Sequence, residues 1–265
     1  MTIRQSNQDP PKRSFREEIE ASEKETNTNK RDQLIVSSIL RVAETESLDL
    51  VVDALAKITD SNTRQQVGNW LYFTRTQSAI KQNRLDEARR LALNVEELDQ
   101  RAYLYAEIAK QSLDRTETDA QTREMLEEVT TAANKGPNTI VTARTLLAVA
   151  FLYTKIDQGR SLSVLADAIK SINRIEAPDF SRQSIFRKIE GRNFARYATF
   201  QTPGFTPESV FTEFGRVNLE DALYQATSLT DKSLRALTTL ALADTCLQQA
   251  QRERKNDKTQ PKGKP

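Results

Sequence analysis

The chain has 265 residues, enough for one or two domains with a buried core, and it contains no histidine and one cysteine. The missing histidine excludes nucleophile systems with an imidazole base and histidine-ligated metal sites. A single cysteine excludes an intramolecular disulfide and a zinc site built from cysteines. The formal net charge is only +2, which does not favour a nucleic-acid-binding groove over the body of the chain.

Residues 1–30 are polar, include Pro10 and Pro11 and carry mixed charge, so we expect this segment to be disordered. Ser14 followed by Glu17 matches a capping box, which allows a short helix within it. The segment lacks the apolar stretch of a signal peptide, and no apolar run of about eighteen residues follows. We therefore expect a cytoplasmic protein without a membrane span if Met1 is the true start.

Residues 31–251 show apolar spacing of three and four almost throughout, and no proline lies between Lys12 and Gly136, so this region is expected to be one helical-repeat domain. The expected helices are 31–44, 47–58, 62–82, 86–95, 98–113, 119–134, 138–155, 160–174, 179–190, 207–215, 219–228 and 231–251. Helices joined by such short turns lie antiparallel to their neighbours.

An eight-position pattern occurs three times with the same offsets, which is typical of a helical repeat. The copies are Leu48, Asp49, Val51, Leu55, Ile58, Asp60, Arg64 and Leu71; Leu85, Asp86, Ala88, Ala92, Val95, Glu97, Arg101 and Ile108; and Leu219, Glu220, Ala222, Ala226, Leu229, Asp231, Arg235 and Leu242.

Within the pattern, the third position is small and would allow close helix approach, and the apolar positions after it form one buried stripe. The later acid is expected to cap the next helix, with the arginine four residues on as its weak ion-pair partner. The pattern predicts an all-α fold: an α-solenoid of about six antiparallel helix hairpins.

Two segments depart from the repeat. Residues 191–206, with Pro203 and Gly204, are expected to form an ordered irregular insertion, either a loop or a loop with a short extended stretch. Residues 252–265 hold six Lys or Arg and two acids, so a disordered basic tail is expected there.

The segments Asn83–Ala88 and Val217–Ala222 are similar to the entry of the second helix in tetratricopeptide repeats. The whole region 31–251 resembles the divergent tetratricopeptide-like proteins found in many bacteria without assigned function. This resemblance implies a solenoid of helix hairpins that binds peptides or partner proteins along a concave face. No set of peptide-binding residues is carried over, because no position here matches one.

Candidate partner-binding residues are aromatic and basic side chains that fall off the expected core stripe or near the insertion. The alternative for the aromatic ones is packing between the helices of a hairpin, and for the basic ones a solvated helix face. The candidates are Tyr72, Tyr103, Arg192, Arg196, Tyr197, Phe200 and Phe205.

No catalytic residue, cofactor or metal is expected. Cys246 lies in an apolar run, which predicts a small buried hydrophobic residue rather than a nucleophile. The adjacent carboxylates Glu96–Glu97 and Glu127–Glu128 would not face one another on a helix.

The leading hypothesis is therefore a non-catalytic helical-repeat scaffold that mediates protein–protein or peptide interaction. The alternative is nucleic-acid binding through the basic stretch 182–196 and the C-terminal tail. A carboxylate-based enzyme is a third reading, which two facing carboxylates in a deep pocket would support.

Overall fold

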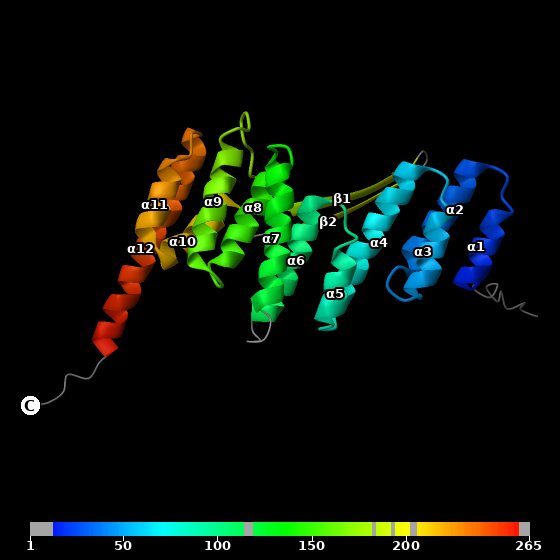
Figure 1. Cartoon of the computed structure of the whole chain (residues 1–265), viewed down its shortest axis with the longest axis horizontal. Helices are drawn as coiled ribbons and strands as arrows, with labels where there is room; N and C mark the ends of the chain where they lie inside the picture. The colour runs from blue at the N-terminus through cyan, green and yellow to red at the C-terminus, as the bar shows by residue number, and fades with distance from the viewer. Residues whose placement is uncertain (1–12, 114–118, 182–183, 192–193, 202–205, 260–265) are drawn as a thin grey trace, which may run out of the picture. The chain divides into compact units, whose positions relative to one another are not determined.

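The computed structural model describes residues 13–113, 119–181, 184–191, 194–201 and 206–259. This part of the chain is almost entirely helical, with one two-stranded sheet, so the expected all-α fold class is confirmed (Figure 1). The helices are α1 (Phe15–Glu23), α2 (Thr28–Val42), α3 (Leu48–Ala56), α4 (Ser61–Lys81), α5 (Leu85–Ala92), α6 (Leu98–Leu113), α7 (Asp119–Lys135), α8 (Ile140–Tyr153), α9 (Gln158–Ile172), α10 (Pro207–Val217), α11 (Leu219–Thr227) and α12 (Lys232–Thr259), and the strands are β1 (Ser184–Gly191) and β2 (Phe194–Gln201). Among the described helices, none has the length and apolar character needed to cross a membrane.

The chain divides into two compact units rather than the single helical domain expected over 31–251. The first unit runs to Arg75 and also includes Arg187–Tyr197, a segment more than one hundred residues further along the chain. The second unit comprises Thr76–Phe186 and the chain from Ala198 onward. Helix α4 and the two strands contribute residues to both units.

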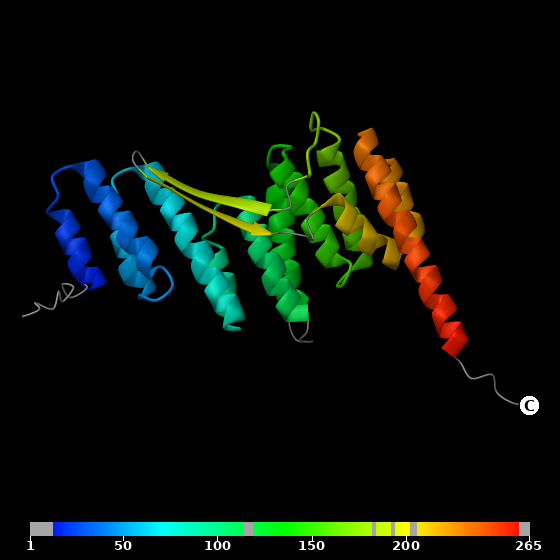
Figure 2. The ribbon, with the colours of Figure 1, turned by 180° about the vertical axis from the view of Figure 1, so that it is seen from behind.

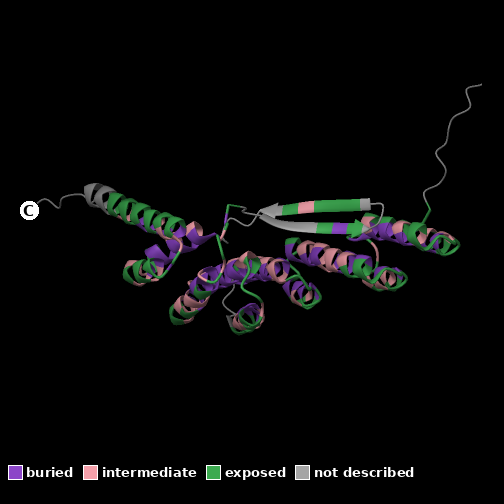
Figure 3. Cartoon of the chain, turned by 90° about the horizontal axis from the view of Figure 1, so that it is seen from above, coloured by how far each residue is buried: buried purple, intermediate pink, exposed green. Residues whose placement is uncertain are grey.

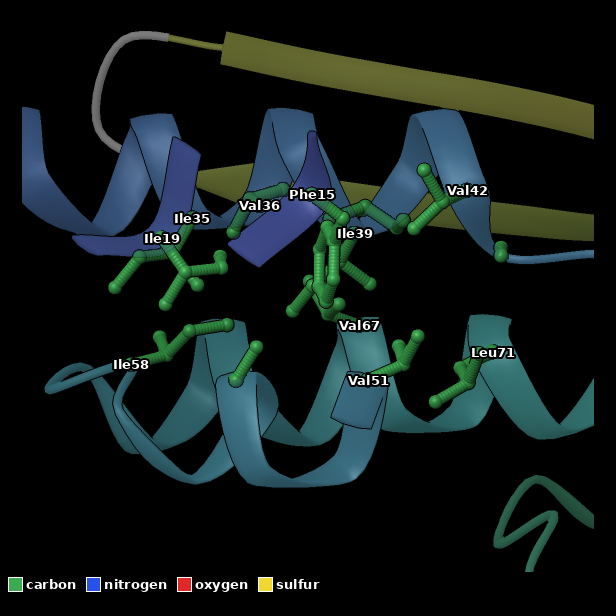
Figure 4. Packing of buried hydrophobic residues seen from close by; sticks show 13 residues of the cluster. Phe15, Ile19, Ile35, Val36, Ile39, Val42, Val51, Ile58, Val67 and Leu71 are labelled. Atoms are coloured by element: carbon green, nitrogen blue, oxygen red, sulfur yellow. The ribbon is translucent and has the colours of Figure 1, made fainter. Parts of the chain in front are cut away.

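The first unit is held by one apolar cluster to which its four helices and one strand residue contribute. Figure 4 shows side chains of α1 and α2 pointing toward those of α3 and α4. The buried members are Phe15, Ile19, Ile35, Val36, Ile39, Val42, Ala43, Val51, Ala54, Ile58, Val67, Leu71 and Ile189.

The expectation of disorder is wrong for the described residues near both termini. Ser14 and Glu17 form the capping box of α1, in which the Glu17 N–H donates to Ser14 Oγ at 3.3 Å and the Ser14 N–H donates to Glu17 Oε2 at 2.8 Å. Helix α1 is stabilised because Phe15 and Ile19, four residues apart, are buried against the first unit. At the other end α12 continues to Thr259. Residues 1–12 and 260–265 lie outside the described part.

The second unit is built around α8, whose residues are buried on almost every side. Helices α6, α7, α9 and α10 pack against it, as Figure 1 shows. Such complete burial explains why residues 142–153 are nearly all apolar, small or hydroxylated, with Arg144 as the exception.

From the third position onward, the apolar positions of the repeated pattern are buried in the second and third copies, whereas Leu55 of the first copy is half-buried. The small third position is fully buried each time, with Val51, Ala88 and Ala222 at 0% exposure. The last aliphatic position, filled by Leu71, Ile108 or Leu242, is also buried. These residues allow the helix of each copy to approach the next one closely.

The capping role of the acid is confirmed at two copies. Asp60 Oδ1 accepts from the Thr63 N–H at 2.7 Å at the start of α4, and Asp231 Oδ1 accepts from the Leu234 N–H at 2.8 Å at the start of α12. The ion pair expected between this acid and the arginine stays a prediction. Arg64 donates to the carbonyl of Ile58 at 2.9 Å and so holds the preceding turn, and Arg101 lies 3.7 Å from Glu128 of α7.

The helix expected over 179–190 is wrong, because residues 184–191 form β1. Ile and Phe side chains in this segment favour a strand when tertiary contacts are available to bury them. The extended stretch considered within 191–206 is present as β2, which pairs with β1 across a two-residue connection. Residues 192–193 and 202–205 lie outside the described part.

Candidate protein-binding surfaces

The tip of the hairpin is anchored on the first unit through β1. Ile189 has 0% exposure and belongs to the apolar cluster of α1–α4. The Glu190 N–H donates to Gln66 Oε1 on α4 at 2.7 Å, and Figure 2 shows the strands ending beside that helix. One buried side chain and one hydrogen bond therefore fix the position of β1 on these helices.

Whereas Ile189 of β1 is buried, Arg196 and Tyr197 of β2 are exposed to solvent, and Tyr197 is 55% exposed. On β1, Lys188 forms an ion pair with Glu190, and this contact raises the pKa of the lysine. Within the described residues the sheet has two strands, so β2 has no strand beside its outer edge. An exposed edge of this kind can accept an added strand from another chain.

The structure distributes the predicted binding residues rather than gathering them. Arg196 and Tyr197 are adjacent on β2 of the first unit. Phe200 lies in β2 by its backbone, although its side chain is outside the description, and Arg192 and Phe205 fall outside the described residues altogether. Tyr72 in the first unit and Tyr103 in the second are both half-buried.

Tyr103 has the environment of a packing residue. Burial and the neighbouring carboxylate of Glu107 raise the pKa of its phenol, which is hydrogen-bonded with Gln77 of α4. The packing alternative therefore describes Tyr103 better than an open binding surface does.

The adjacent carboxylates of α7 serve different neighbours. The carboxylate of Glu127 accepts hydrogen bonds from Arg160 Nε at 2.7 Å and from Arg160 Nη2 at 2.6 Å. It also accepts one from the Tyr153 hydroxyl at 2.8 Å. The hydrogen bond from Arg160 lowers the pKa of Glu127. Glu128 instead accepts from the Tyr105 hydroxyl at 3.2 Å. These contacts link α7 to α6, α8 and α9 and give both carboxylates a structural role.

The carboxyl group of Asp99, at the start of α6, lies in an environment that disfavours its charged form. Burial raises its pKa to about 6, while the Gln100 N–H, which donates to Asp99 Oδ1 at 2.8 Å, acts in the opposite direction. The positive charge of Arg144 on α8 also lowers the pKa of Asp99. The guanidinium of Arg144 lies 6.0 Å from the ring centre of Phe180.

No cluster of three or more potential metal ligands occurs in the described part of the chain.

A surface that the sequence analysis did not identify lies on α12. Leu240 and Leu247 are 67% and 62% exposed, and Cys246 between them is exposed rather than buried as expected. Figure 3 shows exposed residues along this helix. The sequence does contain a second apolar stripe on this helix, with spacings of four and three residues. It is hard to recognise because the run 240–247 is apolar on several sides of the helix.

Comparisons with known proteins do not assign this chain to a family. No protein-family model matches this chain, and searches of curated proteins and of solved structures find no match either.

Proposed function

We propose that the protein is a non-catalytic, tetratricopeptide-like scaffold that binds an extended segment of a protein partner. The observation that carries the proposal is the contrast between the two strands of the hairpin. β1 is fixed by Ile189 and the Gln66 hydrogen bond, while β2 presents Arg196 and Tyr197 to solvent. A strand held on a packed base loses little conformational entropy when a partner binds.

The partner segment would add along the edge of β2 through backbone hydrogen bonds. Tyr197 offers a large aromatic contact surface, and Arg196 offers a fixed positive charge and several hydrogen-bond donors. The proposal of a non-catalytic role is supported by the pairing of Glu127 and Glu128 with different helices and by the absence of histidine from the sequence.

The test places a photo-crosslinking amino acid at Tyr197 of the full chain, in the cells from which the protein comes. Tyr224 on α11, which is 72% exposed, provides a matched control position. We expect one discrete adduct with another protein from position 197 and none from position 224. We also expect Arg196→Glu to reduce the yield of this adduct several-fold. Equal labelling from both positions would contradict the proposal.

The nucleic-acid alternative predicts a different result. Generic RNA or DNA would bind the purified chain with an affinity that falls steeply with salt. In the described hairpin, however, Lys188 is neutralised by Glu190, which leaves fewer cations for phosphates. If RNA binding is tight and Arg196→Glu abolishes it, the scaffold proposal should be replaced by that alternative.

A further inference from the structure

Helix α12 of the second unit carries an exposed seam of apolar residues with heptad spacing. Successive members are four, three, four and three residues apart, which is the spacing of the core positions in a coiled coil. All five are exposed, and leucine and alanine alternate along the seam. Its members are Ala236, Leu240, Ala243, Leu247 and Ala250.

The seam lies on the side of α12 away from its own unit. Leu234, Thr238, Leu242 and Thr245 are buried, and at about 100° per residue their stripe is roughly opposite the seam. The buried stripe packs on α10, where Leu242 lies close to Gly215. A contiguous line of exposed apolar side chains on one side of a helix is typical of an interaction surface, so the seam indicates a surface that a partner covers.

The surroundings of the seam are almost free of charge. Charged residues make up 29% of the chain, yet between Ala236 and Gln251 the only one is Asp244. Depletion of charge is typical of the central part of a protein interface. A helix face meant to remain in water would carry charges at several of these positions.

We propose that a second copy of this chain covers the seam, with the two α12 helices antiparallel about a twofold axis. In an antiparallel pair, each a position shares a layer with a d position of the other helix. Here every a position is leucine and every d position is alanine, so each leucine packs beside an alanine of the partner. Alternating large and small residues fill such an interface without voids, which makes the seam complementary to itself.

The charges outside the seam are compatible with this pairing. With leucine at the a positions, Asp244 is the only charged residue at a flanking e or g position between Ala236 and Gln251, and in the antiparallel pair it falls beside Leu237 of the other copy. No pair of like charges is therefore brought together along this part of the helix.

The size of the interface predicts a moderate affinity. One helix seam with its flanks buries on the order of 500 Å² per copy, below the roughly 800 Å² of a standard interface. Residues 236–251 span about 24 Å at 1.5 Å per residue. We therefore expect a reversible dimer with a dissociation constant of roughly micromolar size.

The first test measures the mass of the purified full chain by sedimentation velocity from about 1 to about 100 µM. We expect a concentration-dependent shift from monomer to dimer. Leu240→Glu and Leu247→Glu together should weaken dimerisation at least tenfold, whereas Leu93→Glu, at a leucine of 55% exposure directly after α5, should not. A chain that remains monomeric over this range, or equal dimerisation of both variants, would overturn the proposal.

Folding of each variant is checked by its helical circular dichroism. If the double variant loses helix content, Ala243→Gln supplies the same comparison with a residue that favours helices. It should also weaken dimerisation, because a longer side chain at a d position holds the helices apart. Dimerisation that is unchanged in a folded Ala243→Gln chain would count against the seam.

A charge-exchange experiment tests the antiparallel orientation. Leu240→Glu and Ala243→Lys chains are each expected to dimerise poorly alone. Mixed together they should form a heterodimer, since the introduced acid of one copy meets the introduced base of the other in a single layer. A parallel pair would instead place position 240 beside position 240, and mixing would restore nothing.

The seam on α12 and the residues Arg196–Tyr197 of β2 belong to different units, and the self-association does not rest on partner binding by the hairpin. A monomeric seam variant that still gives the adduct at position 197 would separate the two.

Discussion

At the scale of single residues, buried polar groups in this protein stabilise turns and link helices. Asp32 of α2 is 7% exposed, and its Oδ2 atom accepts from the Thr59 and Asp60 N–H groups at 3.0 Å each. Asn173 does the same for the turn before α12, accepting from the Thr230 N–H at 2.9 Å and donating to the Ser228 carbonyl at 2.8 Å. In each case one side chain satisfies backbone groups that the helix ends leave unpaired.

The negative charge of Asp99 lowers the free energy of unfolding, because the carboxylate is buried in the folded chain. Burial raises its pKa from 3.8 to about 6, so between these values the folded chain keeps a proton that the unfolded chain has lost. The contribution of Asp99 to the free energy of unfolding is therefore full below pH 4 and decreases as pH rises toward 6. Above pH 6 the folded protein holds a buried carboxylate.

We predict that Asp99→Asn raises the free energy of unfolding by about 2–3 kcal/mol at pH 7.5 and has little effect at pH 4. Urea denaturation at the two pH values measures the difference. Glu127→Gln provides a control of opposite sign. Arg160 lowers the pKa of Glu127, so this substitution should destabilise the chain at pH 7.5 and lose its effect as pH falls. An Asp99→Asn effect independent of pH would contradict the prediction.

At the scale of helices and strands, the repeated pattern sets where helices end and how closely they pack. Asn83, in the turn before α5, has φ of 59°. Asparagine tolerates this left-handed conformation better than most residues, so the turn into α5 keeps the geometry that glycine would provide.

We predict that Gly215→Ala destabilises the second unit by about 1 kcal/mol or more, despite the higher helix propensity of alanine. A Cβ atom at this position would lie 2.7 Å from Leu242 Cδ2, and because Leu242 is fully buried its side chain would have to shift within the packed core. Gly159→Ala is the matched control, because the nearest atom to its new Cβ, Asp157 Oδ1, is 3.6 Å away. Thermal unfolding should show a lower midpoint for the first variant only.

Strand β1 illustrates where local patterns are insufficient. Apolar residues in 179–190 occur at spacings compatible with a helix, and Gly191 and Asn193, which favour hairpin turns, follow immediately. The choice between helix and strand depends on Ile189, which is buried among helices more than one hundred residues earlier in the chain. Sequence periodicity within one segment contains no information about this contact.

At the scale of the whole molecule, the division into two units implies that local damage stays local. We predict that Ile189→Ala destabilises the first unit by about 2–4 kcal/mol, since it removes a fully buried side chain from its core. Amide hydrogen exchange should accelerate in α2 and the first half of α4, while α8 and α9 keep their protection. Lys188→Ala, at an exposed neighbour, serves as the control.

Uniform acceleration in both units after Ile189→Ala would show that the chain unfolds as a single cooperative body. In that case the two units would be a feature of packing density and not of stability.

By itself the sequence determined the all-α class, most helices and the buried positions of the repeat, because apolar periodicity, caps and turn residues act over a few neighbours. It also showed that histidine chemistry is absent. Tertiary structure alone decided that residues 184–201 form a hairpin, that Ile189 belongs to the first unit and that Tyr103 is half-buried. It likewise decided which of the two apolar stripes of α12 is covered, because both have helical spacing and only packing against α10 distinguishes them.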